Sequence, residues 1–319
     1  MGHDWNAGDF PAIKDIRLSM DISVRELVSQ FCNTGFQTHN IWVASTILSD
    51  MARENATIFL SFTSNISASG VRGVIIDLAR RKKVHAIVVS SGALDEDIAR
   101  AKMPYLQGSF DADDASLGRS GINRMGSIFV PNECYGYLEE KITEVLGKIC
   151  SDNGEREFSA TEIIRQIGLN LDTEDSFVYQ AARNGIPIFC PGISDGAVGL
   201  QLAFFQQTHP GFKVNELKSA IEAIDFAMTS KKKGKVGAII LGGGIAKHHA
   251  IISNLLGGGL DYAIYVNSSS PYHGSLSGAT TSEAKSWGKV GEKARDVTIF
   301  GDAAVVFPLL VASSDCFLE

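Results

Sequence analysis

The stretch that decides the fold is KVGAIILGGGIAKHH, residues 235–249. Its apolar run Ala238–Leu241 predicts a strand buried on both faces, as in a parallel sheet. Three glycines follow this run, and Ala246–Leu256 then shows the three- and four-residue apolar spacing of a helix. A strand, a tight glycine turn and a helix make half of a βαβ unit, so the stretch predicts a doubly wound α/β fold.

The same alternation recurs along most of the chain. Helical spacing appears at Val71–Lys83, Tyr137–Cys150, Ala160–Ile167 and Val214–Met228, with Ser159 as a candidate N-cap. The other expected strands are Thr57–Phe62, Ala86–Val89, Ile186–Phe189, Tyr262–Val266 and Val297–Phe300. Strands separated by helices predict a doubly wound, mostly parallel, Rossmann-like sheet.

The first 50 residues differ from the rest. Ser23–Phe31 and Ile41–Met51 have helical patterns with no strand between them. We therefore expect a helical N-terminal extension at 1–50, packed on an α/β body at 51–319. A length of 319 residues allows two domains, but no long linker or solenoid-like repeat divides the chain, which favours a single domain overall.

Composition excludes several classes of protein. A net charge of −7 argues against a nucleic-acid binder. The longest apolar stretch, Ala303–Ala312, is about half of a membrane span, and no secretory signal opens the chain. Five scattered cysteines without a C-x-x-C pair predict reduced thiols, no metal site and a cytoplasmic location. The basic run Lys231–Lys235 is expected to be a solvated loop.

Small polar residues follow every expected strand, where a doubly wound sheet binds its ligands. Small side chains let backbone amides approach a phosphate. The segments are 63–65 (TSN), 90–92 (SSG), 191–196 (PGISDG), 241–244 (LGGG), 267–269 (NSS) and 301–303 (GDA). Together they predict a dinucleotide site. Asp195 or Asp302 is either a ribose ligand or a helix N-cap, and the sequence leaves both readings open.

Two further motifs contain groups that suit catalysis. In Lys247-His248-His249 the two histidines point about 100° apart, so one can face a site as general acid or base while the other faces core or solvent. In Ser286-Trp287-Gly288-Lys289 the lysine is either an exposed charge or, if Trp287 walls it off from water, an imine-forming nucleophile.

These motifs, in this order from about Gly35 onward, resemble the deoxyhypusine synthase family. The most specific are GGG-x-x-KHH at 242–249 and SWGK at 286–289. The resemblance also rests on TSN with SG (63–65, 69–70), GINR (121–124), VPNE (130–133), SDG (194–196), DYA (261–263), SGA (277–279) and the segment ending in VFPLL (302–310).

The resemblance implies an NAD-dependent transferase and a homotetramer with active sites at subunit interfaces. Spermidine would give its aminobutyl group, through an enzyme imine, to one lysine of the hypusine-carrying translation factor. Lys289 would be the nucleophile and His248 would handle the amine proton, while Asp95, Glu283 and Trp287 would bind the amine. NAD would be held by Ser64, Asn65, Ser90, Ser91, Asp195, Gly243, Ser268, Ser269, Asp302 and Ala303.

The chain also departs from the family pattern. Asp95 replaces a glutamate, two aspartates expected at the substrate amines fall on Leu200 and Leu276, a third falls on His273, and an asparagine falls on Ile252. An ammonium buried against leucine would lack a counter-ion; Glu96, Asp97 or His273 are candidates to compensate. Two alternatives therefore stay open: a transferase with another donor or a small-amine acceptor, as in homospermidine formation, and a weakly active NAD-binding partner subunit.

Overall fold

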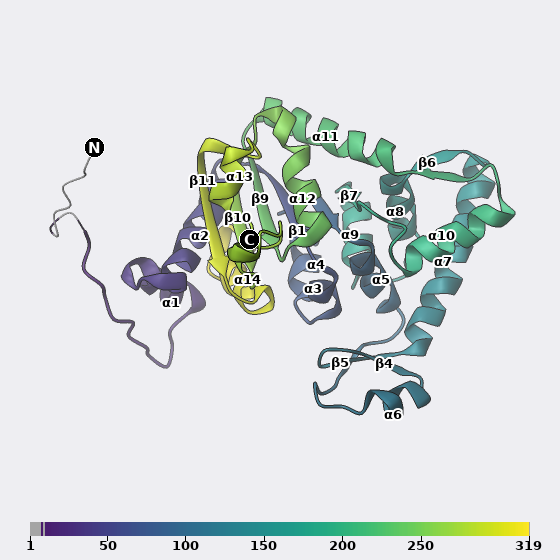
Figure 1. Cartoon of the computed structure of the whole chain (residues 1–319), viewed down its shortest axis with the longest axis horizontal. Coiled ribbons are helices and arrows are strands. Elements are labelled where there is room, and N and C mark those ends of the chain that lie inside the picture. Colours follow the sequence, from purple (N-terminus) through teal and green to yellow (C-terminus); the bar gives the residue numbers. More distant parts are fainter. Residues whose placement is uncertain (1–7, 9, 319) are drawn as a thin grey trace.

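The computed structural model describes residue 8 and residues 10–318, and a six-stranded sheet lies at its centre (Figure 1). The strand order is β11-β10-β9-β1-β2-β7, and every neighbouring pair is parallel. All six predicted strands are confirmed: β1 (Thr57–Phe62), β2 (Ala86–Val89), β7 (Ile188–Phe189), β9 (Val236–Leu241), β10 (Leu260–Asn267) and β11 (Val290–Phe300).

This order contains one reversal. The chain moves outward from β1 through β2 to β7 and then returns to β9, on the other side of β1. Loops that leave β1 and β9 therefore run in opposite directions from adjacent strands. Such a reversal opens a crevice at the carboxyl edge of a parallel sheet, where doubly wound proteins bind ligands. The predicted Rossmann-like fold is confirmed.

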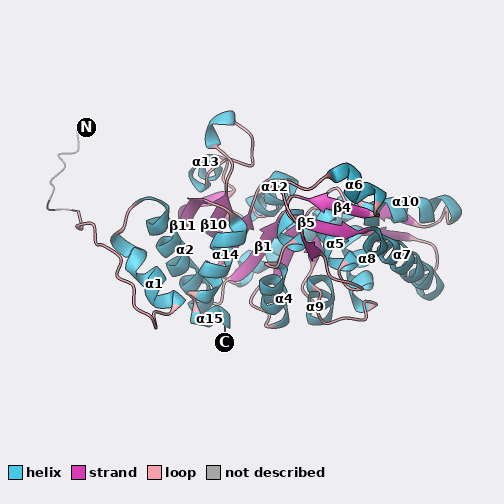
Figure 2. Ribbon diagram, turned by 90° about the horizontal axis from the view of Figure 1, so that it is seen from below, coloured by secondary structure: helices cyan, strands magenta, loops and turns pink. Residues whose placement is uncertain are grey.

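Helices cover both faces of the sheet (Figure 2). Side chains alternate along each strand, so Phe59 and Ile240 face one layer while Leu60 and Ile239 face the other. The first layer contains α11 (Glu216–Lys233), α12 (Gly244–Ser253) and α13 (Thr281–Ser286). The second includes α2 (Phe36–Arg53), α4 (Arg72–Arg80), α9 (Phe177–Asn184) and α14 (Ala303–Ala312).

Local sequence explains where several helices begin and end. Ser159 caps α8 (Ala160–Leu169) as predicted: its hydroxyl accepts from Glu162 N–H at 3.1 Å, and the Glu162 carboxylate accepts from Ser159 N–H at 2.8 Å. The solvated loop expected at 231–235 was wrong for its first three lysines. They form the last turn of α11, where cations favour the helix dipole, and Lys231 pairs with Asp261 at 2.7 Å.

The N-terminal region contains the two expected helices. Ser23 and Glu26 form a capping box at the start of α1 (Val24–Gln30). The next helix, α2, buries Ile47, Leu48 and Met51 in the core and contacts β10 and β11. It therefore belongs to a helical layer of the sheet and continues past residue 50. The division into 1–50 and 51–319 stays a prediction.

The remaining elements are short or lie at the periphery. An antiparallel sheet with α6 projects from the body (Figure 1), and its strands are too short for hydrophobic alternation to reveal them. None of the helices in the described residues combines the length and apolar character needed to cross a membrane. The remaining helices and strands of the described chain are η2 (Phe31–Asn33), α3 (Ser64–Ala68), α5 (Ser91–Ala99), β3 (Leu106–Gln107), α6 (Asp114–Arg119), β4 (Ile122–Met125), β5 (Ile128–Pro131), α7 (Asn132–Asn153), β6 (Glu157–Ser159), α10 (Ala197–Thr208), β8 (Lys213–Asn215), η3 (Leu255–Gly257), η4 (Pro271–His273) and α15 (Asp315–Leu318).

A buried ion pair joins α4, α5 and α9, and its loss is expected to be costly. The Asp97 carboxylate accepts from Arg72 Nε at 2.7 Å, Ser176 Oγ at 2.5 Å and Val178 N–H at 3.0 Å. In Asp97→Asn the Arg72 guanidinium stays buried without its counter-ion, so urea denaturation should show a loss of about 3–5 kcal/mol.

The matched control is Asp77→Asn, because the Arg80–Asp77 pair is roughly half exposed. We expect that change to lower the free energy of unfolding by less than about 1 kcal/mol. Equal, small losses in the two variants would contradict a structural role for the Asp97 cluster.

Candidate active site

The segments that follow β1, β2 and β7 meet at the carboxyl edge of the sheet. Ser91 Oγ donates to the Ile193 carbonyl at 3.0 Å and so joins the loops after β2 and β7. A Cβ built on Gly92 would lie 3.1 Å from Ser64 Cβ, which joins the loops after β2 and β1. These contacts produce one continuous site from segments spread over the chain.

The structure places all ten predicted cofactor residues at this edge, because each follows the carboxyl end of a strand. They are Ser64 and Asn65 (β1), Ser90 and Ser91 (β2), Asp195 (β7), Gly243 (β9), Ser268 and Ser269 (β10), and Asp302 and Ala303 (β11). Their roles stay predictions.

The two aspartates left open by the sequence differ in the structure. Asp302 is the N-cap of α14 and accepts from Ala304 N–H at 2.7 Å. Asp195 lies exposed before α10, and Gly196 occupies the cap position instead. The Asp195 carboxylate is therefore better placed than that of Asp302 to bind a ligand hydroxyl.

The glycine turn has the backbone and the close packing of a phosphate cradle. Gly242 and Gly244 have φ of +91° and +68°, which favours glycine. Gly243 is the N-cap residue of α12, and a Cβ there would lie 2.5 Å from Ser277 Cβ. A Cβ on Gly242 would lie 2.8 Å from Thr63 Oγ1, in the segment after the adjacent strand β1. This is the point of the fold where a dinucleotide would fit.

If the predicted dinucleotide is NAD, valine at position 243 should therefore weaken its binding. Its side chain must displace Ser277 and the turn, and we expect the dissociation constant for NAD to rise roughly 10- to 100-fold, or about 1.4–2.8 kcal/mol. Gly136→Ala is the control, since a Cβ at that helical glycine has nothing within 4 Å. An unchanged NAD affinity in titration calorimetry of Gly243→Val would move the cofactor elsewhere.

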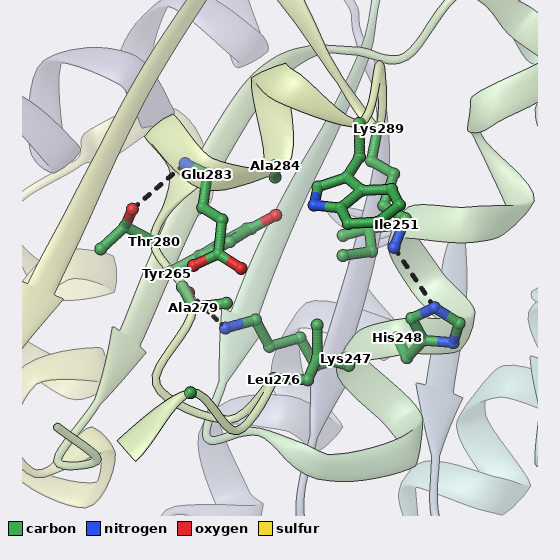
Figure 3. A pocket seen from close by; sticks show the side chains of 12 residues that line it. Lys247, His248, Ile251, Tyr265, Leu276, Ala279, Thr280, Glu283, Ala284 and Lys289 are labelled. Atoms are coloured by element: carbon green, nitrogen blue, oxygen red, sulfur yellow. Dashed lines mark hydrogen bonds between the residues drawn. The ribbon is translucent and has the colours of Figure 1, made fainter. Parts of the chain in front are cut away.

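A cavity of about 540 Å³ lies beside this turn, between α12 and α13. Lys289 Nζ lies 3.3 Å from His248 Nε2 inside it (Figure 3). Burial, aided by the charge of Lys289, lowers the pKa of His248 below its ordinary value. His248 is therefore neutral near pH 7 and able to accept a proton from the lysine. His249 does not line the cavity.

The cavity walls suit an aliphatic amine. Lys289 Nζ lies 5.4 Å from the centre of the Trp287 ring. Glu283 is the carboxylate among the described residues that line the cavity, and its amide donates to Thr280 Oγ1 at the start of α13. Ile251 and Leu276 add apolar surface. Lys289, His248, Glu283 and Trp287 thus meet in one cavity, and their roles stay predictions.

Asp95, in contrast, has another partner. Its two oxygens accept from Ala197 and Val198 N–H at 2.8 and 2.9 Å, so it caps α10 and does not line the Lys289 cavity. Glu96 beside it is 3% exposed, and its Oε2 has no hydrogen-bond partner among the described residues. Burial raises the pKa of this carboxyl group. Sequence cannot tell which of three consecutive acidic residues keeps a free oxygen.

Comparison with known proteins decides the family. The family model "Deoxyhypusine synthase" matches residues 26–314. The chain belongs to the deoxyhypusine synthase family. It is 44% identical to a "Probable deoxyhypusine synthase" of Thermoplasma volcanium, over 94% of this chain and 96% of that one. A Halobacterium salinarum protein of the same name is 37% identical, over 96% and 92%.

Solved structures support the deoxyhypusine synthase fold. A crystal structure described as a putative deoxyhypusine synthase from Entamoeba histolytica matches with a TM-score of 0.67 at 24% identity, covering 95% of this chain and 96% of that chain. At this identity the match concerns the fold alone.

The departures from the family pattern fall mostly outside the cavity. Leu276 lines it, whereas Leu200 is an exposed residue of α10 and Ile252 is 37% exposed. His273 Nδ1 accepts from Ser275 N–H at 3.0 Å in an exposed turn. One apolar replacement therefore bears directly on the space next to Lys289.

Proposed function

We propose that this protein is an NAD-dependent deoxyhypusine synthase: it transfers the aminobutyl group of spermidine to one lysine of the hypusine-carrying translation factor. The observation that carries the proposal is the 3.3 Å contact between Lys289 Nζ and His248 Nε2, inside a cavity that also presents Glu283 and Trp287. Family membership supports the same assignment.

Lys289 would act as the nucleophile. His248 removes a proton from its ammonium, and the neutral amine attacks the oxidised carbon next to the secondary nitrogen of the donor. The C–N bond to the donor breaks, 1,3-diaminopropane leaves, and the four-carbon unit stays on Lys289 as an imine. The acceptor lysine then displaces Lys289 from the same carbon, and reduction of the new imine completes deoxyhypusine.

NAD, when bound, would take up a hydride from the donor and return it to the product imine. The residues present fit it: small polar side chains gather at the strand ends, and the glycine turn leaves no room for side chains. Ser64, Asn65, Ser90, Ser91, Gly243, Ser268 and Ser269 would hold it, with Asp195, Asp302 and Ala303.

Glu283 would bind the terminal ammonium of the donor, with Trp287 beside its chain. Large apolar side chains near the cavity remain exposed, including Trp287 at 66%, Tyr272 at 96% and Ile245 at 53%. Such surface favours coverage by another subunit, and supports the proposed homotetramer with active sites between subunits.

The test is incubation of the purified protein with NAD and spermidine labelled in the butyl part, with and without the translation factor. We expect label on one lysine of the factor and NADH formation that depends on spermidine. The absence of both NADH and label would reject the proposal.

A second candidate function is favoured by Leu276, which places an alkyl group where the cavity would otherwise offer a counter-ion to a cationic donor. It is a related aminobutyl transferase with another donor or a small-amine acceptor. When putrescine is added to the same assay, this candidate predicts transfer of the label to putrescine, giving homospermidine, and no label on the translation factor.

A further inference from the structure

Lys247 is a fully buried lysine in the wall of the cavity, on the first turn of α12. Its ammonium donates to the carbonyl oxygen of Ala279 at 2.7 Å (Figure 3) and to that of Ser277 at 3.3 Å. It also lies 4.7 Å from the centre of the Tyr265 ring. Its partners are thus two carbonyl groups and an aromatic face, and none of these is a carboxylate.

The two carbonyl groups belong to one loop, residues 274–280. This loop has a second attachment to α12, because Gly244 N–H donates to Ser277 Oγ at 3.1 Å. A side chain at Gly278 would collide with the Ser270 carbonyl, so the loop is also packed closely on itself. Lys247 and Ser277 therefore hold the loop against the first turn of α12 from both sides.

The same loop contributes to both ligand sites. Leu276 forms part of the amine cavity. Its neighbour Ser277 packs so closely against Gly243 that a Cβ built on that glycine would lie 2.5 Å from Ser277 Cβ. A displacement of the loop would thus alter the proposed amine and dinucleotide sites together.

We propose that Lys247 is a positioning residue that couples the two sites: by holding loop 274–280 on α12 it makes each ligand bind more tightly when the other is present. The proposal rests on the function proposed above. It assigns Lys247 no contact with the reacting atoms.

The chemistry of lysine suits this task. A protonated amine offers three N–H donors on a flexible stem and can reach two carbonyl groups at once. Burial lowers the pKa of Lys247 to about 8, opposed by the negative charge of Glu283. The ammonium is therefore retained at neutral pH despite its complete burial, as expected of a group whose hydrogen bonds are in use.

The test measures coupling by titration calorimetry on the full-length protein. NAD is titrated alone and with saturating 1,8-diaminooctane, which has the length of spermidine but a methylene in place of the secondary amine. In the wild type we expect the diamine to lower the dissociation constant for NAD roughly tenfold. Methionine has a similar length to lysine but no charge, so in Lys247→Met both ligands should still bind. The diamine should then lower the dissociation constant for NAD by less than about twofold.

Ser277→Ala provides an independent variant, since it removes the acceptor for Gly244 N–H. It should weaken the effect of the diamine on NAD affinity in the same way. Lys293→Met on β11 is the control, because that lysine is exposed. In this variant the diamine should change the NAD affinity as much as in the wild type. If Lys247 and Ser277 were purely structural, their replacement would lower thermal stability but leave the effect of the diamine on NAD affinity unchanged. Full coupling in Lys247→Met and Ser277→Ala would overturn the proposal.

The same titrations separate this proposal from the proposed function. A wild type that binds NAD and the diamine with no mutual effect would refute the coupling alone. A wild type that binds no NAD would refute the proposed function, and the coupling with it.

Discussion

Replacing Lys289 with alanine is expected to lower aminobutyl transfer by roughly a thousandfold or more, about 4 kcal/mol in the activation free energy. The variant loses the amine that would attack the oxidised donor, and the methyl group of alanine cannot form the imine. NAD affinity should be unchanged, because the residue faces His248 and Trp287 rather than the glycine turn. Transfer of labelled aminobutyl groups and calorimetry with NAD measure the two effects separately.

Two further variants show whether the amine or its charge matters. Lys289→Arg keeps a cation but cannot supply a neutral amine near pH 7, so it should be as inactive as the alanine variant. Lys285→Ala, one turn away on α13 and paired with Asp296 at 2.5 Å, should keep most of the activity. Full transfer by Lys289→Ala would refute the assignment of the nucleophile.

The second large effect is expected at His248. Asparagine at this position cannot take the proton from Lys289, and we expect kcat to fall about 10²- to 10⁴-fold. His248 must be neutral to act, and its pKa is lowered by burial and by Lys289. In the wild type the rate should therefore decline only as the pH falls below about 6.5, the ordinary value for histidine.

This acid limb should be absent from the pH profile of His248→Asn. His249→Asn is the matched control, because His249 is the adjacent residue and does not line the cavity. It should retain kcat to within about fivefold. Equal losses in the two variants, or an unchanged acid limb in His248→Asn, would contradict a proton-transfer role.

Sequence predicted the layers of the fold well, because parallel strands such as Thr57–Phe62 are apolar along their whole length and so stand out from their surroundings. It also placed the loops that we propose bind NAD at the carboxyl edge of the sheet, since the strand ends determine where these loops lie. The ends of helices were harder to predict from the sequence. Helix α11 continues past Met228 through the lysines, because helix C-termini favour cations.

The assignment of Lys289 and His248 as the proposed catalytic pair depended on the family resemblance. Local sequence left the roles of Lys289 and His248 open, because they are 41 residues apart and meet only in the folded chain, in the cavity between α12 and α13. The acidic triplet 95–97 shows the limit of composition. Asp95 caps α10, Asp97 anchors α9 and Glu96 keeps an unpartnered oxygen, a distribution decided by neighbouring helices rather than by local pattern.

The most direct test of the central claim is borohydride trapping during turnover with NAD and labelled spermidine, followed by peptide mass spectrometry. Reduction fixes an imine where it has formed. We expect one aminobutyl group on Lys289 and, with the translation factor present, a decrease of that label as the translation factor gains it. Label trapped on Lys247 or another lysine, or modification of the factor with no trapped intermediate, would contradict it.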